Sequence, residues 1–184
     1  MPNQKEITQI SKFLSLVLRH KPETIGIDLD VNGWTDTDIL LTKLNQNGWS
    51  IDFKTLKSVV ETNAKQRFAF NSTLTKIRAN QGHSIEVDLN IKSQKPPEIL
   101  FHGTGSNSVL FILETGLEKK GRNHVHLSSD IETAIKVGQR HGKPFVFEIL
   151  AQEMHNDNFE FYLSENGVWL TDHVPVKYLR DHAL

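Results

Sequence analysis

The chain contains no cysteine among its 184 residues and no long hydrophobic run. The absence of cysteine excludes disulfide scaffolds, thiolate zinc sites, iron–sulfur ligation and cysteine nucleophiles. No apolar stretch approaches the roughly 20 residues of a membrane-spanning helix. The polar start, MPNQKE, lacks the basic and then apolar pattern of a signal peptide. We therefore expect a cytoplasmic protein that does not associate with a membrane.

Neither sign of charge dominates the sequence. The 21 Lys+Arg and 22 Asp+Glu give a formal net charge of −1, which excludes a histone-like polycation but not a local basic site. Hydrophobic residues make up 38% and charged residues 23%, as in a folded protein with its own core. This length suits one ordinary domain or two small lobes.

The run Ser93-Gln94-Lys95-Pro96-Pro97 predicts a linker, because two consecutive prolines cannot continue a helix or a central strand. Residues 1–95 hold 13 Lys+Arg against 10 Asp+Glu, a net charge of +3. Residues 96–184 hold 8 against 12, a net charge of −4, and seven of the nine histidines. We expect two lobes with different tasks, residues 1–95 and residues 96–184.

The first lobe opens with hydrophobic residues at helical spacing: Ile10, Phe13, Leu14, Val17 and Leu18. They predict a helix that ends before Pro22. Two further helices are expected at about 36–47 and 52–63, each starting with an aspartate that suits capping and the helix dipole. The period then changes to two in 67–70 and 76–79, which predicts a hairpin. Three helices followed by such a wing describe a winged-helix arrangement, which often handles nucleic acid.

The second lobe is richer in short strands. Strands are expected at 98–102, 144–149, 159–163 and 168–170, and helices at about 106–115 and 130–140. Short strands with two small helices favour an α+β lobe over a repeated βαβ sheet.

Two motifs resemble metal sites. Asp28-x-Asp30-x-Asn32-Gly33 imitates the first half of a calcium loop, but Ile39 stands where the bidentate glutamate belongs, so we expect a turn that leads into a helix. His124-Val125-His126 could place two rings on one side of a strand, and we favour a structural or ligand-contacting pair over a metal site.

Trp34 and Trp49 each follow a glycine at the boundary of an element. Core packing is the ordinary role of tryptophan at such positions, and we assign it to both.

Basic residues gather at two points of the first lobe. Arg19-His20-Lys21 lies at a helix C-terminus, where cations favour the dipole. Arg78 precedes the polar turn Asn80-Gln81-Gly82-His83. The helix end and the wing can both face a phosphorylated ligand, because arginine forks match phosphate oxygens and histidine adds a titratable donor.

The segment His102-Gly103-Thr104-Gly105-Ser106 follows an apolar strand and precedes a helix. Small residues there would let backbone N–H groups approach a phosphate or a ribose at the helix N-terminus. The segment is neither a P-loop nor a G-x-G-x-x-G fingerprint.

Taken together, five segments resemble the NAD-dependent RNA 2′-phosphotransferase family: SKFLSLVLRHKP at 11–22, IRANQGHSI at 77–85, LFHGT at 100–104, RNHVHLS at 122–128 and VGQRHG at 137–142. The match runs in order over nearly the whole chain. The resemblance implies an α+β protein with an N-terminal winged-helix-like RNA lobe and a C-terminal ADP-ribosyltransferase-like lobe.

The resemblance also implies an activity, the removal of an internal 2′-phosphate left at a tRNA splice junction. The 2′-phosphate would attack the nicotinamide ribose of NAD and expel nicotinamide. The ribose 2″-hydroxyl would then release RNA with a free 2′-OH and ADP-ribose 1″,2″-cyclic phosphate. The expected partners are RNA carrying a 2′-phosphate and NAD, consumed as co-substrate, with no metal and with the chain acting as a monomer.

The family's Arg-His-Arg-Arg tetrad would map onto Arg19, His20, Arg78 and Arg140, with Arg122 as the alternative fourth arginine. By the same resemblance, the residues expected at the NAD site are His102, Gly103, Thr104, Arg122, His126, Leu127 and Ser128. Those expected to contact RNA are Lys21, Asn80, Gln81, Gly82 and His83.

Two other functions stay open at this point. One is ADP-ribosylation of another acceptor, such as a nucleic-acid end phosphate or a protein, because a fold does not fix its function. The other is a non-catalytic nucleic-acid-binding protein with a decayed NAD lobe, against which the retention of all four tetrad candidates argues.

Overall fold

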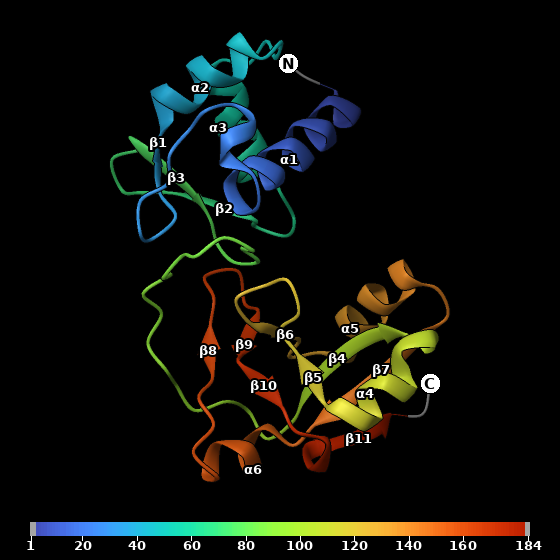
Figure 1. Cartoon of the computed structure of the whole chain (residues 1–184). Helices are drawn as coiled ribbons and strands as arrows, with labels where there is room; N and C mark the ends of the chain where they lie inside the picture. The colour runs from blue at the N-terminus through green and yellow to red at the C-terminus, as the bar shows by residue number, and fades with distance from the viewer. Residues whose placement is uncertain (1–2, 183–184) are drawn as a thin grey trace. The chain divides into compact units, whose positions relative to one another are not determined.

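The computed structural model describes residues 3–182 and divides into two compact units (Figure 1). The first unit ends at Asn90 and the second begins at Ile91. The boundary expected after residue 95 lies close to this division, and Ser93 forms an isolated antiparallel bridge with Tyr162 inside the second unit. Within 3–182, no helix is long and apolar enough to cross a membrane.

The predicted N-terminal helix is confirmed as α1, Gln4–Arg19. Asn3 and Glu6 form a capping box, in which each side chain accepts a hydrogen bond from the other residue's backbone N–H. His20 is the C-cap, and the 3₁₀ turn η1, Pro22–Thr24, follows. Arg19 and His20 therefore lie together at the C-terminal end of α1.

The two further helices of the first unit are also confirmed, as α2, Thr37–Gln46, and α3, Phe53–Glu61. Asp36 and Asp52 precede them as N-caps, and their carboxylates accept hydrogen bonds from N–H groups of the first turn. Such caps satisfy backbone donors that have no partner within the helix.

The predicted hairpin is present as β2, Phe68–Phe70, and β3, Lys76–Ala79. A short strand that the sequence did not predict, β1, Thr35–Asp36, pairs with the other edge of β3, so the sheet order is β1-β3-β2. Arg78 thus lies on the central strand of a three-stranded antiparallel sheet. The core between helices and sheet includes Leu14, Val17, Leu18, Leu40, Leu44, Leu56, Val59 and Ile77.

The second unit contains small sheets that agree with the α+β class. Its strands are β4 Leu100–Gly105, β5 Leu117–Glu118, β6 Val125–Leu127, β7 Pro144–Ile149, β8 Tyr162–Leu163, β9 Trp169–Thr171, β10 His173–Val174 and β11 Leu179–His182. They pair in the orders β11-β7-β4, β6-β9-β8 and β10-β5. An isolated bridge between Phe101 and Ser128 joins β4 to the end of β6. The core includes Leu100, Leu127, Phe147, Ile149, Met154 and Phe161.

Both predicted helices of the second unit are confirmed, although each combines an α-helix with a 3₁₀ turn. The elements are η2 Ser106–Ser108, α4 Val109–Thr115, α5 Ile131–Gly138 and η3 Gln139–His141. Two more short elements follow, α6 Ala151–Asn156 and η4 Val176–Tyr178.

The sequence predicts that His102–Ser106 forms the connection between a strand and a helix. The structure instead places both glycines of this segment inside β4. Their role is close packing. A Cβ on Gly103 would stand 1.7 Å from the carbonyl oxygen of Ala134 on α5, and one on Gly105 would stand 2.4 Å from that of His141. Only glycine lets the strand approach these backbones so closely.

Candidate active site

The end of α1 is tied to the loop that follows β3. The Nδ1 atom of His20 lies 2.8 Å from the hydroxyl oxygen of Ser84, and the Ser84 N–H donates to the carbonyl of Arg19 at 3.0 Å. The next residue, Lys21, is exposed, and its N–H donates to the carbonyl of Leu16 at 2.9 Å. The loop thereby fixes the orientation of the His20 ring.

Arg19 is half-buried between β2 and the same loop. Its guanidinium carbon lies 6.0 Å from the centre of the Phe68 ring, and Nη2 donates to the carbonyl of Arg67 at 3.4 Å. Gly82 also lies near this side chain, and an added Cβ there would stand 3.5 Å from Nη1. Gly82 has a φ of +87°, a left-handed conformation that glycine adopts without strain.

Arg78 is 9% exposed, and its guanidinium carbon lies 4.5 Å from the centre of the Trp34 ring. Nearby, Asn80 is buried, and its side-chain amide donates to the carbonyl of Gln66 at 2.7 Å. Among residues 3–182, the side-chain oxygen of Asn80 has no hydrogen-bond partner. A buried acceptor without a protein partner costs free energy, which favours a ligand donor or a water at this position.

His83 stands among these cations and is 2% exposed. Burial, followed by the positive charges of Arg19, His20 and Arg78, lowers its pKa to about 4. The ring is therefore neutral at neutral pH, and its Nε2 atom has no hydrogen-bond partner within the described part of the chain. Three predicted tetrad residues and His83 thus lie close enough to interact electrostatically, in one cluster of the first unit.

A second cluster lies in the second unit, around β4 and β6. The Nδ1 atom of His102 lies 3.1 Å from the carbonyl oxygen of His126, and because a carbonyl can only accept, Nδ1 carries the proton. Burial lowers the pKa of His102, and the charges of Lys120, Arg122 and His141 add to this effect against the hydrogen bond to His126. His102 is therefore neutral near pH 7 and presents Nε2 as an acceptor.

His126 is bound by Arg122, whose Nη1 lies 2.5 Å from the His126 Nδ1. Arginine can only donate, so Nδ1 accepts and Nε2 of a neutral His126 carries the proton. His124 precedes β6, and its ring packs against Tyr162 with a centroid separation of 5.7 Å. The two histidines thus have different surroundings.

Across residues 3–182, no group of three or more carboxylates and histidines could hold a metal ion.

The remaining predicted site residues differ in which of their groups can contact a ligand. Leu127 is 1% exposed within the core, so only its backbone can contact a ligand. Arg140 lies on η3 with an exposed side chain, next to His141. Gln81 is half-buried beside Gly82.

Backbone groups along β4 extend this cluster. Phe101 and Ser128 exchange both backbone hydrogen bonds, at 2.9 and 2.8 Å. Because alternate residues of a strand direct their peptide groups to the same side, Gly103 directs its N–H and C=O to this edge, just beyond the bridge. That edge can pair with an amide-bearing ligand.

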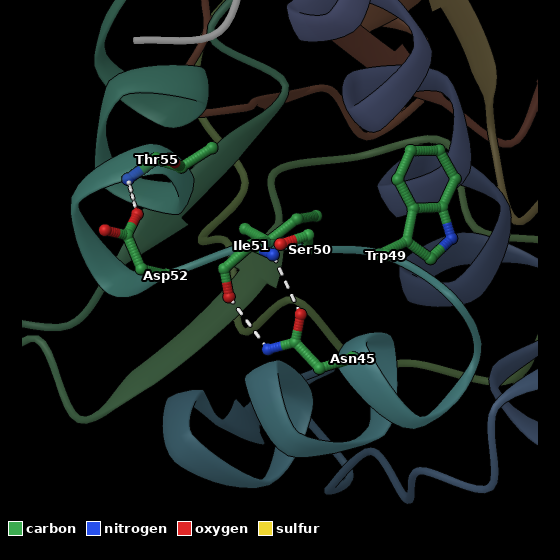
Figure 2. Close-up of a pocket in the computed structure, with 6 residues that line it drawn as sticks. All are labelled: Asn45, Trp49, Ser50, Ile51, Asp52 and Thr55. Atoms are coloured by element: carbon green, nitrogen blue, oxygen red, sulfur yellow. Dashed lines mark hydrogen bonds between the residues drawn. The ribbon is translucent and has the colours of Figure 1, made fainter.

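The first unit contains a cavity of about 550 Å³. Its lining residues, shown in Figure 2, are Asn45, Trp49, Ser50, Ile51, Asp52 and Thr55. Asn45 holds the backbone of Ile51 through two hydrogen bonds of 2.8 Å, and the Asp52 carboxylate accepts from the N–H of Thr55. These polar groups are engaged in local structure. None of the residues predicted for catalysis lines the cavity, and we do not assign it to the active site.

The sequence of this chain is similar to a known protein family and to individual relatives over nearly its whole length. Residues 5–173 match a family described as "RNA 2'-phosphotransferase, Tpt1 / KptA family". A protein of Nostoc punctiforme named "Probable RNA 2'-phosphotransferase" is 53% identical over 178 residues, which is 97% of this chain and 98% of the relative. A protein of the same name from Flavobacterium johnsoniae is 52% identical over 177 residues, covering 96% and 97% of the two chains.

These matches show the class of this protein, which is a transferase. The chain belongs to the RNA 2′-phosphotransferase family.

Sequence reasoning missed two residues of the first cluster. Ser84 lies in the segment 77–85 but was given no role, and Trp34 was assigned to core packing, although its ring faces Arg78. The signal that could have found Trp34 is the pairing of β1 with β3, which a strand of two residues does not reveal.

Proposed function

We propose that this chain removes an internal 2′-phosphate from RNA by transferring it to NAD, and that a tRNA splice junction is the type of substrate. The observation that carries the proposal is the gathering of Arg19, His20 and Arg78 around a neutral His83 in the first unit. Two guanidinium groups and an imidazole suit a phosphate dianion, and the neutral His83 adds a hydrogen-bonding group without a further charge.

In this proposal the first unit is a winged-helix-like RNA-binding lobe, and its three helices with the β1-β3-β2 sheet support that assignment. The second unit is an ADP-ribosyltransferase-like lobe that binds NAD. Its support is the acceptor Nε2 of His102 and the edge of β4 at Gly103, which together offer donors and acceptors to an amide and a ribose.

NAD supplies an electrophilic anomeric carbon and a leaving group, nicotinamide. In the first step a 2′-phosphate oxygen forms a bond to this carbon while the bond to nicotinamide breaks. In the second step the ribose 2″-hydroxyl attacks phosphorus, and the bond to the RNA 2′-oxygen breaks. The products are RNA with a 2′-OH and ADP-ribose 1″,2″-cyclic phosphate, so no water is consumed.

The residues of the first cluster have distinct tasks in these steps. Arg19 and Arg78 hold the phosphate, and their fixed forks stabilise the charge that develops on its oxygens in the second step. His20 protonates the departing RNA 2′-oxygen, while its Nδ1 is oriented by Ser84. Arg140 is the proposed fourth arginine, and Arg122 the alternative.

Incubation of the full chain with a 2′-phosphorylated oligonucleotide, with and without NAD and in the presence of EDTA, tests the proposal. We expect loss of the 2′-phosphate only when NAD is present, and we expect EDTA to have no effect. Loss of the phosphate without NAD, with release of inorganic phosphate, would identify a phosphatase and contradict the proposal.

A further inference from the structure

Trp34 lies directly beside Arg78 because of the register of the sheet. Strand β1 lies beside β3 (Figure 1), and in their pairing Thr35 stands opposite Ile77 and Asp36 opposite Lys76. Continuing this register by one residue places Trp34 opposite Arg78, and the guanidinium carbon lies 4.5 Å from the centre of the indole ring. The indole is thus a flat support for the guanidinium, on the edge of the sheet away from β2.

The turn before β1 is built to hold Trp34 in place. One carboxylate oxygen of Asp30 accepts hydrogen bonds from the N–H groups of Asn32 and Trp34, both at 3.0 Å, while the other lies 3.1 Å from the ammonium group of Lys76. Partial burial alone would raise the pKa of Asp30, but these hydrogen bonds lower it, so the carboxylate is ionised at neutral pH. The motif that imitates a calcium loop therefore has another task here.

The loop that carries His83 closes on the same turn. The Asn32 side chain donates to the carbonyl of Asp88 at 2.7 Å, and the Asp88 N–H donates to the carbonyl of Val31 at 2.8 Å. A Cβ on Gly33 would stand 3.3 Å from the Nε2 atom of His83. The turn, the loop and Arg78 are therefore one packed assembly.

We propose that Trp34 is a positioning residue that orients Arg78 for the RNA 2′-phosphate, and this inference rests on the proposed function. Stacking occupies the face of the guanidinium and fixes its plane, and a guanidinium in a defined plane is what two-point binding of a phosphate requires. An aliphatic side chain at position 34 would fill part of the space but would not fix that plane.

Trp34→Leu and Trp34→Phe test the inference, with Trp49→Leu as the matched control. Trp49 also follows a glycine with a positive φ and is also half-buried, but it packs on Phe13 at a centroid separation of 4.9 Å. We expect Trp34→Leu to weaken binding of a 2′-phosphorylated oligonucleotide and to slow turnover with NAD. The expected loss is about 2- to 30-fold, the range that a cation–π contact supports. Trp34→Phe should recover most of it.

A double-mutant cycle with Arg78→Ala separates positioning from a general effect on the fold. If Trp34 acts through Arg78, Trp34→Leu causes no further loss in the Arg78→Ala background, and Trp49→Leu leaves binding and turnover at the wild-type level. Equal losses from Trp34→Leu in both backgrounds, or failure of Trp34→Phe to recover function while thermal unfolding is unchanged, would overturn the inference.

The binding assay without NAD keeps the two proposals apart. A wild-type chain that binds the oligonucleotide but never removes its 2′-phosphate contradicts the proposed function, while the cycle on binding still decides the role of Trp34. A wild-type chain that neither binds nor converts the oligonucleotide overturns both.

Discussion

His83→Gln tests the electrostatic description of the first cluster. The pKa of the buried His83 is lowered to about 4, against 6.5 in the unfolded chain. Between these values the unfolded chain binds more protons than the folded one, so stability rises with pH across this window and is lost as pH falls from 6.5 towards 4. A shift of this size corresponds to about 3 kcal/mol of unfolding free energy, since each pKa unit contributes about 1.4 kcal/mol.

The assay is urea unfolding between pH 7 and pH 4, followed by tryptophan fluorescence. Trp169 is replaced by Phe in both proteins, so that Trp34 and Trp49, which lie in the first unit, report its unfolding. We expect the chain with His83 to lose about 3 kcal/mol more than the His83→Gln variant over this range. Parallel pH profiles for the two proteins would refute the burial and the charge environment assigned to this ring.

Four further outcomes are expected. Gly103→Ala should destabilise the second unit by about 3 kcal/mol or more in thermal unfolding, because its Cβ meets a backbone carbonyl. Gly82→Ala should cost about 1–2 kcal/mol of stability in thermal unfolding through its positive φ, while its Cβ would make only van der Waals contact with Arg19. Arg78→Ala or Arg140→Ala should accumulate the ADP-ribosylated RNA intermediate, unlike Arg122→Ala, in a mass assay. RNA affinity should fall with salt at a slope of about −0.7 per phosphate neutralised, and an affinity that does not change with salt would contradict contacts to phosphates.

Local patterns in the sequence were enough to predict most elements of the first unit. The hydrophobic spacing of α1, the aspartates that cap α2 and α3 and the alternation in β2 and β3 are each contained in a few neighbouring residues. The short strand β1 has no such pattern, because its pairing with β3 depends on a turn built by Asp30. That long-range pairing is also what places Trp34 on Arg78.

The glycines of β4 show the same limit in the second unit. A glycine pair after an apolar run is typical of a turn, and the sequence contains no sign that the carbonyls of Ala134 and His141 lie against Gly103 and Gly105. The residues expected at the NAD site could be named from the family resemblance, but their hydrogen-bonding roles could not. The proton positions of the His102 and His126 rings follow only from the carbonyl and the guanidinium that they contact.

The fate of a labelled 2′-phosphate tests the central claim most directly. An oligonucleotide whose internal 2′-phosphate carries ³²P is incubated with the full chain and NAD, and the products are separated and identified by mass. We expect the label to leave the RNA and to appear only in ADP-ribose 1″,2″-cyclic phosphate, with one nicotinamide released for each phosphate transferred. Label recovered as inorganic phosphate, or retained on the RNA while nicotinamide is released, would contradict the account.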